Sequence, residues 1–235
     1  MRQLFSGALL AACCFLTSQL TAQNSNEFDV FIGGLKTGRL SLKMEAKANM
    51  YSASVFLRTI GLVSAIAPYR FEAAVHGSIL KNHHRPRHYS EKSDTGKRQT
   101  NKIISYVNGV PKVTQSKSRE PHWLVPETQK DRIDTVTATY QLLQDRSASE
   151  LCQQHLKLFD GDRAVDITLF GKTTDDTEVI CQGLYQRIGG FSKKQMRKGI
   201  DFPFTLRYRP TGDDNYQAHN LSVKTIRGRA KFRRR

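Results

Sequence analysis

Strict alternation of apolar and polar residues is the feature that most limits what this chain can fold into. Leu40, Leu42, Met44 and Ala46 alternate with polar residues, and a second alternating run follows Asn49. A period of two places the apolar side chains on one face of an extended strand. The pattern therefore predicts half-buried strands at residues 27–32, 40–46, 51–57, 71–75, 87–92, 98–107, 156–159, 165–169, 178–187, 202–208 and 216–224, and the last of these runs on into residues 229–235.

Turn residues separate these runs and favour antiparallel pairing. Asp160-Gly161 lies between two alternating runs, which is the strongest hairpin signal in the chain. Other turns are expected at residues 94–96, 108–109 and 212–215. Between them, Asp134 can cap a helix that reaches Asp145, with one apolar stripe along it. About ten strands and one or two helices predict a mainly β fold, a curved antiparallel sheet or open half-barrel wrapped around the helices.

Residues 1–23 are typical of a secretory signal peptide. Arg2 precedes the uncharged residues 4–16, and small and polar residues lead to Ala22 and Gln23, after either of which we expect cleavage. Thirteen helical residues span roughly 20 Å, too short for a hydrocarbon core of about 30 Å. A competing interpretation is a lipobox at residues 10–13, with a lipidated Cys13 as the membrane anchor. We therefore predict a periplasmic protein with one β-rich envelope domain, residues 24–235, that ends in a basic tail.

The charge of the chain indicates the kind of partner. Lys and Arg number 37 against 21 Asp and Glu, a net charge of +16. Such an excess suggests nucleic acid in a cytoplasmic protein, but export excludes nucleic acid and leaves lipid, lipoprotein, lipopolysaccharide or an anionic membrane surface. Alternatively, the charge merely keeps the protein soluble. The tail is either a surface-docking element or a solvated, frayed terminus. Its docking residues would be Arg227, Arg229, Lys231, Arg233, Arg234 and Arg235.

Few residues suggest a disulfide, a metal site or a catalytic site. Cys152 and Cys181 remain after removal of the signal, and an even number in an oxidising compartment favours a disulfide. On a regular strand His84 and His88 share a face while His83 points away, and arginines between them disfavour a metal. No Gly-x-Ser-x-Gly motif or phosphate-binding loop is present in the sequence. We expect no catalytic residue, metal or cofactor.

Four stretches carry a resemblance to a known family. They are residues 28–35 with Gly38, residues 134–138, Cys152 followed by Leu158-Phe159-Asp160-Gly161-Asp162-Arg163, and Cys181 followed by residues 185–191. Together they resemble the bacterial envelope family called domain of unknown function 3108. Its architecture is similar to that of the periplasmic lipoprotein carriers and their outer-membrane acceptor, which implies a curved antiparallel sheet around a helix with an apolar concavity. Its cysteine pair matches Cys152 and Cys181, and its motif positions are Phe159, Asp160, Gly161, Arg163, Gly190 and Phe191.

The family that the sequence resembles has no agreed activity. This sequence departs from the family's pattern in one place, because Val136 stands where a Pro often follows the Asp. The turn of a tight hairpin alone also explains Asp160 and Gly161.

Three functions follow as hypotheses. The first is a non-enzymatic envelope protein that holds an acyl chain, lipid or lipoprotein segment in the concave sheet, which predicts an uncharged, aromatic-lined cavity. The second is a structural adaptor in envelope maintenance that docks on anionic surfaces. The third is an envelope hydrolase, which predicts a perturbed acid or base beside a nucleophile.

Overall fold

The computed structural model describes residues 22–235 apart from 82, 176 and 226–227. Its strands are β1 (Ala22–Ile32), β2 (Leu35–Lys47), β3 (Met50–Thr59), β4 (Arg70–Leu80), β5 (His83–Asp94), β6 (Gln99–Val107), β7 (Val110–Gln115), β8 (Arg146–Ser147), β9 (Gln154–Phe159), β10 (Ala164–Asp175), β11 (Glu178–Gly189), β12 (Asp201–Gly212), β13 (Asn215–Thr225) and β14 (Gly228–Arg234). The helices are α1 (Gly61–Ile66), α2 (Thr135–Leu143) and α3 (Lys193–Arg197), with single 3-10 turns at Pro126–Thr128 and Ala148–Glu150.

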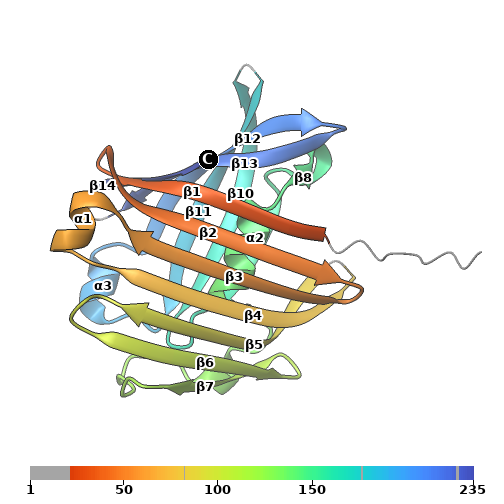
Figure 1. Cartoon of the computed structure of the whole chain (residues 1–235). Helices are drawn as coiled ribbons and strands as arrows, with labels where there is room; N and C mark the ends of the chain where they lie inside the picture. Colours follow the sequence, from red (N-terminus) through yellow and green to blue (C-terminus); the bar gives the residue numbers. More distant parts are fainter. Residues whose placement is uncertain (1–21, 82, 176, 226–227) are drawn as a thin grey trace, which may run out of the picture.

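The described strands form one antiparallel sheet in the order β7-β6-β5-β4-β3-β2-β1-β14-β13-β12-β11-β10-β9, and β8 pairs with β13. The sheet curls so that β1 to β7 lie in front of β10 to β12, with α2 between the two layers (Figure 1). The edges β7 and β9 do not pair with each other, so the barrel stays open. The predicted fold class, a curved antiparallel sheet around a helix, is confirmed.

The alternation seen in the sequence builds the core. The apolar residues of β2 and β3, such as Leu42 and Val55, face inward and are buried, as are Ile104 of β6 and Leu206 of β12. α2 contacts β3, β4 and β9, and its buried side chains belong to the same core cluster. The centre of the half-barrel is thus partly filled by its own helix.

Asp134 begins α2, as predicted. One carboxylate oxygen, Oδ1, accepts hydrogen bonds from the backbone N–H of Val136 and Thr137, each at 2.9 Å. The other accepts from the Thr137 hydroxyl at 2.6 Å, and that hydroxyl lies 2.8 Å from the hydroxyl of Tyr51 on β3. Complete burial raises the pKa of Asp134. The cap therefore positions α2 against the sheet as well as satisfying its first turn. The helix ends at Leu143, slightly before Asp145.

The C-terminal residues form β14, a central strand of the sheet rather than a frayed tail. β14 pairs with β1 on one side and β13 on the other, and the backbone N–H of Arg235 donates to Glu27. Alternation places Arg229, Lys231 and Arg233 on the outer face, exposed. The same alternation turns Arg234 inward.

Arg234 is therefore misplaced in the predicted docking set. Its side chain is 10% exposed and donates hydrogen bonds to the side chain of Asn26 and to the Ala218 carbonyl. Its guanidinium also lies over the Phe28 ring. Arg227, another member of that set, lies outside the described residues.

A β-bulge overturns the expected arrangement of histidines. His88 pairs with His76, but the next residue pair is Pro86 with Gly77, so the register shifts at this point. The extra residue reverses the facing of the side chains before it. His84 consequently faces the interior, where its ring contacts those of Tyr51 and Tyr140, whereas His88 stacks on His76 outside. The two do not share a face. In the described part of the chain no group of three metal-ligating side chains is found.

The two open edges are tied together by a largely buried cluster of four polar side chains around Lys102, which we call the clasp (Glu91, Lys102, Gln115 and Asp162). Lys102 Nζ of β6 donates to Asp162 Oδ2 at 3.0 Å and to the Asp160 carbonyl at 2.7 Å, and it lies 3.6 Å from Glu91 Oε1. Gln115 of β7 donates to the other oxygen of Asp162. The clasp joins β6 and β7 to the β9–β10 turn across the gap in the barrel.

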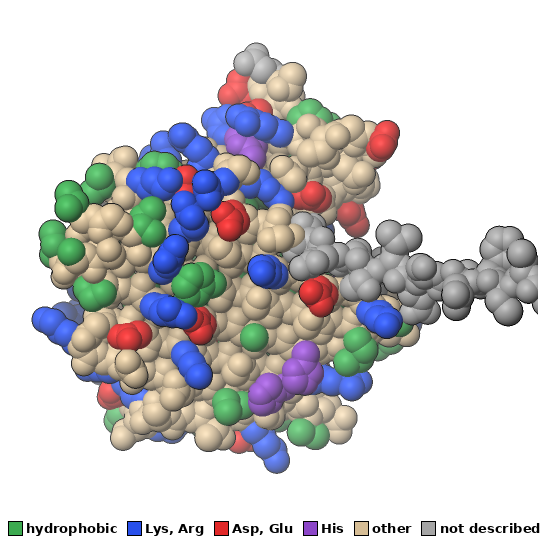
Figure 2. Space-filling model, viewed as in Figure 1, with side chains coloured by type: hydrophobic (Ala, Val, Ile, Leu, Met, Phe, Trp, Pro, Cys, Tyr) green, Lys and Arg blue, Asp and Glu red, His purple; other side chains and the backbone are tan. Residues whose placement is uncertain are grey.

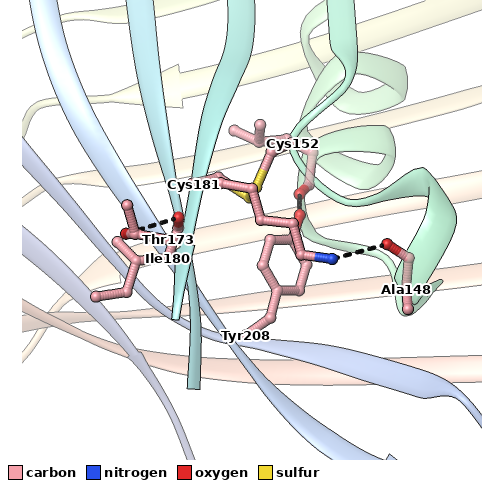
Figure 3. Close-up of a disulfide and its surroundings, with 8 residues drawn as sticks. Ala148, Cys152, Thr173, Ile180, Cys181 and Tyr208 are labelled. Atoms are coloured by element: carbon pink, nitrogen blue, oxygen red, sulfur yellow. Dashed lines mark hydrogen bonds between the residues drawn. A yellow bond between two sulfur atoms is a disulfide. The ribbon is translucent and has the colours of Figure 1, made fainter. Parts of the chain in front are cut away.

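The disulfide predicted between Cys152 and Cys181 is present in the structure (Figure 3). Cys152 lies in the connection between α2 and β9, whereas Cys181 is fully buried on β11. Tyr208 lies beside the bridge, and its hydroxyl donates to the carbonyl of Leu142 in α2. Both contacts fix the C-terminal side of α2 against the strands behind it.

Most of the predicted signal peptide, residues 1–23, lies outside the part of the chain that the structure describes. Residues 1–21, with the signal peptide and Cys13, lie outside the described residues, and β1 begins at Ala22. Cleavage after Ala22 or Gln23 would shorten β1 by one or two residues and leave the buried Phe28 and Val30 in place. No helix in the described ranges combines the length and apolarity required to cross a membrane.

Candidate functional site

A cavity of about 320 Å³ lies between α2 and the inner face of the strands β10 to β13. This volume is at the lower end of the range for small-molecule pockets, about 300–1,000 Å³. Aliphatic and aromatic side chains make up most of its wall. The lining residues are Leu142, Ile167, Tyr185, Arg187, Phe202, Phe204, Leu221, Val223 and Thr225.

Sheet register brings the lining residues together. Tyr185 pairs with Ile167 on one side and Phe202 on the other, and Phe204 pairs with Val223. Because directly opposed residues share a face, this patchwork of neighbours forms a continuous apolar surface. The rings of Tyr185 and Phe202 meet edge to face, with centroids 6.0 Å apart.

Gly183 creates the room for one aromatic wall. It lies opposite Phe204 on the inner face of β11. A Cβ atom at this position would come within 2.2 Å of the Phe204 ring, closer than any real contact. The absence of a side chain at Gly183 leaves the space that the Phe204 ring occupies against β11.

Arg187 is the one charged residue among the described lining residues, and its guanidinium is held by aromatic rings and backbone carbonyls. Its guanidinium lies 4.7 Å from the Phe202 ring centroid and 4.8 Å from that of Phe191. It donates to the carbonyls of Gln195 and Gly199, at 2.6 Å and 2.9 Å. Arg187 therefore holds the loop that contains α3 at one end of the cavity.

The family-motif positions gather beside Arg187. The Asp160 carboxylate accepts from the backbone N–H of Asp162 and Arg163, and Gly161 has a φ of +95° that suits glycine. Gly190 also has a positive φ, and a Cβ there would clash with the Asp162 carbonyl at 2.3 Å. Arg163 lies over Phe191 at 5.3 Å. Phe159 is fully buried.

These contacts assign the motif a structural role. Asp162 and Arg163 of the β9–β10 turn lie against Gly190 and Phe191, at the start of the loop that contains α3. Phe191 in turn contacts Arg187. The motif thus supports one end of the cavity without lining it. Tyr185, Arg187 and Phe202 do line the cavity, but none of them is a predicted site residue; Tyr185 and Arg187 belong to one of the stretches that carry the family resemblance. Alternation along β11 and β12 places them on the same face as the buried Cys181 and Phe204.

Ionisable groups contribute little within the cavity. Burial raises the pKa of Tyr185, so this phenol stays neutral and acts as an aromatic wall. Among the described lining residues there is no carboxylate, imidazole or thiol. Such a wall suits a hydrocarbon chain and gives no pairing of a nucleophile with a base.

Other hollows are more polar. One of about 460 Å³ lies near the open edges and is lined by His84, Arg132, His155 and their neighbours, of which Arg132 and His155 already pair with Asp166. A shallow hollow of about 560 Å³ on the outer face is floored by small residues of β3, β4 and β5, such as Ser54, Ala74 and Ser90.

The fold and this cavity define an open β half-barrel with a central helix and an apolar pocket. The family model described as protein of unknown function, DUF3108, matches residues 27–182, and the chain belongs to this family. Among solved structures, the chain is similar to a β-barrel-like protein of domain of unknown function DUF1849 from Brucella abortus, with 10% identity, coverage of 93% of this chain and 97% of the other, and a TM-score of 0.46. No curated protein matches the sequence.

Proposed function

We propose that the protein is a non-enzymatic periplasmic carrier that holds one hydrocarbon chain, from a lipid or an acylated protein, in the cavity beside α2. The observation that supports this most directly is the lining itself, which combines four aliphatic residues with three aromatic ones from α2 and four strands. The charge of Arg187 is already stacked between Phe191 and Phe202. A buried alkyl chain gains about 0.8 kcal/mol per methylene, so even a short segment would bind usefully.

The disulfide also supports the periplasmic part of the proposal, because such bridges persist in oxidising compartments. A carrier must keep its cavity open when the ligand leaves. The bridge and the Tyr208–Leu142 hydrogen bond fix the position of α2 relative to β11 and β12, which would keep the cavity from changing its size when the ligand leaves.

A fluorescent fatty-acid analogue tests the proposal. Val223 is half-buried on the cavity wall, and Val223→Phe would fill part of the space. Ser222→Phe adds the same ring on the outer face of the same strand and is the matched control. We expect the unmodified protein and Ser222→Phe to bind the analogue, and Val223→Phe to bind at least about tenfold more weakly because a ring occupies the site.

Folding of each variant is checked by near-ultraviolet circular dichroism, and Val223→Ala provides a second, enlarging change. Equal binding by Val223→Phe and Ser222→Phe would place the ligand elsewhere. No binding by any form, together with no lipid in mass spectra of protein purified from its own envelope, would refute the carrier. The partial filling of the barrel by α2 would then favour a structural adaptor.

A further inference from the structure

α1 is an exposed apolar element at one end of the sheet. Residues 60–69, which contain it, carry no charged side chain, and α1 has no buried residue. Leu62 and Ile66 are each 86% exposed, the highest values among the large hydrophobic residues described. Their spacing of four places them on one face of the helix. Exposure of two large aliphatic side chains on one turn requires an explanation.

The β1–β2 turn extends this surface. Ile32 and Leu35 flank the turn and are 46% and 62% exposed. The connection into α1 is held against β2 by a hydrogen bond from the Ile60 N–H to the Thr37 carbonyl, at 3.0 Å. We call Ile32, Leu35, Leu62 and Ile66 the apolar tip. Figure 2 shows hydrophobic side chains at this end of the molecule, with Lys and Arg on the adjoining strands.

Those basic residues oppose one another across the strands. Arg39 lies opposite Arg58, which lies opposite Arg70, and Lys224 lies opposite Arg229. Like charges at directly opposed positions destabilise a sheet. Arg70 pairs with Glu72 and Arg39 with Asp29, but Arg58, Lys224 and Arg229 have no ion pair within the described part of the chain. An external anion would relieve this repulsion.

We propose that the α1 end docks on the surface of an anionic phospholipid bilayer, with the apolar tip inserted at the headgroup boundary. The basic residues beside the tip then lie against the lipid phosphates; they are Arg39, Arg58, Arg70, Lys224 and Arg229. Uncharged aliphatic residues rimmed by cations are the combination that binds this interface. A helix that binds this interface lies in its plane, with the apolar face buried by about 5–10 Å.

This orientation also has a consequence for the cavity. Phe202 and Thr225 line the cavity, and they lie at the beginning of β12 and at the end of β13. Lys224 pairs with Arg229, and the Gly33 N–H donates to the Arg229 carbonyl, so this end of β13 lies near the apolar tip. Docking would thus bring the cavity to the membrane side. The docking itself does not depend on the proposed function.

Vesicle co-sedimentation tests the docking. The full mature chain is mixed with vesicles of phosphatidylethanolamine and phosphatidylglycerol, or of phosphatidylcholine alone. The test variant is Leu62→Ser/Ile66→Ser. The matched control is Met50→Ser/Leu80→Ser, which removes exposed apolar residues at the opposite ends of β3 and β4, where Met50 is 42% and Leu80 52% exposed. All four positions are on the surface, so thermal unfolding should be unchanged.

We expect the test variant to lose at least about tenfold in binding to anionic vesicles, and the control to bind as the unmodified protein does. Arg58→Gln/Arg229→Gln should weaken binding and flatten its dependence on salt. In addition, Trp fluorescence of Leu62→Trp should shift to the blue with vesicles, whereas that of Leu80→Trp should not.

Equal binding by the test and control variants, equal binding to neutral vesicles, or no binding at all would overturn the proposal. Loss of self-association rather than of vesicle binding in the test variant, measured by sedimentation velocity, would assign the tip to a second copy of the chain and also overturn it. Because these vesicles contain no fluorescent ligand, failure here leaves the test of the cavity intact.

Discussion

Replacement of Lys102 by Met should open the clasp and strongly destabilise the fold. The Lys102 side chain is 10% exposed, and Asp162 and Glu91 beside it are 12% and 15% exposed. Removal of one partner from a buried ion pair leaves the other charges uncompensated and typically costs about 3–5 kcal/mol. Lys102 faces two carboxylates and also donates to the Asp160 carbonyl, so we expect a loss of about 4 kcal/mol in the free energy of unfolding at neutral pH.

The loss should depend on pH in a defined direction. Burial raises the pKa of Glu91, and the charge of Lys102 opposes that rise. Without Lys102 the pKa of Glu91 in the folded state rises further. A carboxyl group with a raised folded pKa stabilises below its unfolded pKa, about 4.3, and this contribution is lost as the pH rises through the folded value. The deficit of Lys102→Met should therefore be smallest near pH 4 and largest above neutrality.

Urea unfolding at several pH values measures this deficit. Lys92→Met, which removes an exposed cation from the neighbouring strand, is the matched control and should change stability by less than about 0.5 kcal/mol. Lys102→Met/Glu91→Gln should recover more than about 1 kcal/mol of the loss, because it removes a buried charge. A loss below about 1 kcal/mol, or one that does not change with pH, would refute the role of the clasp.

Four further predictions address other parts of the molecule. Cys152→Ser or Cys181→Ser should lower the free energy of unfolding by about 2–5 kcal/mol in urea titrations, and both thiols of the native protein should resist alkylation until reduced; two freely labelled thiols would contradict the bridge. Asp134→Ala should cost about 1–2 kcal/mol in the same assay through loss of the α2 cap, and an unchanged midpoint would contradict that role. Arg234→Gln should destabilise by about 1–3 kcal/mol while Arg233→Gln on the outer face changes little, and equal effects would contradict the inward placement. Amino-terminal sequencing of the exported protein should begin after Ala22 or Gln23, whereas a lipidated Cys13 at the start would contradict simple cleavage.

Local patterns predicted local structure well. Alternation identified Leu42 and Val55 as core residues, Asp160-Gly161 marked the β9–β10 hairpin, and Asp134 marked the start of α2. Each depends on residues close in sequence. The capping box of α3, Ser192 with Gln195, was equally visible in the sequence but was missed, because five helical residues carry no apolar stripe.

Long-range pairing could not be predicted in this way. β14 pairs with β1, at the opposite end of the chain, and no local signal specifies that partner. The bulge between His84 and His88 is likewise set by the partner strand β4. The cavity beside α2 depends on the combined volumes of side chains from several elements, including the missing side chain of Gly183, so alternation predicted its inner face but not its empty space.

The central position of β14 decides how the basic C-terminal residues can be studied. Deletion of residues 227–235 would remove a strand that is hydrogen-bonded on both sides, and it would expose the edges of β1 and β13. Loss of vesicle binding by such a protein would reflect lost structure as readily as lost charge. Substitutions at Arg229, Lys231 and Arg233 keep the backbone pairing and change only the outer face, so they separate the two effects. Of these, Arg229 lies nearest the apolar tip and should weaken docking most, because electrostatic attraction falls off within about 10 Å at 0.1 M salt.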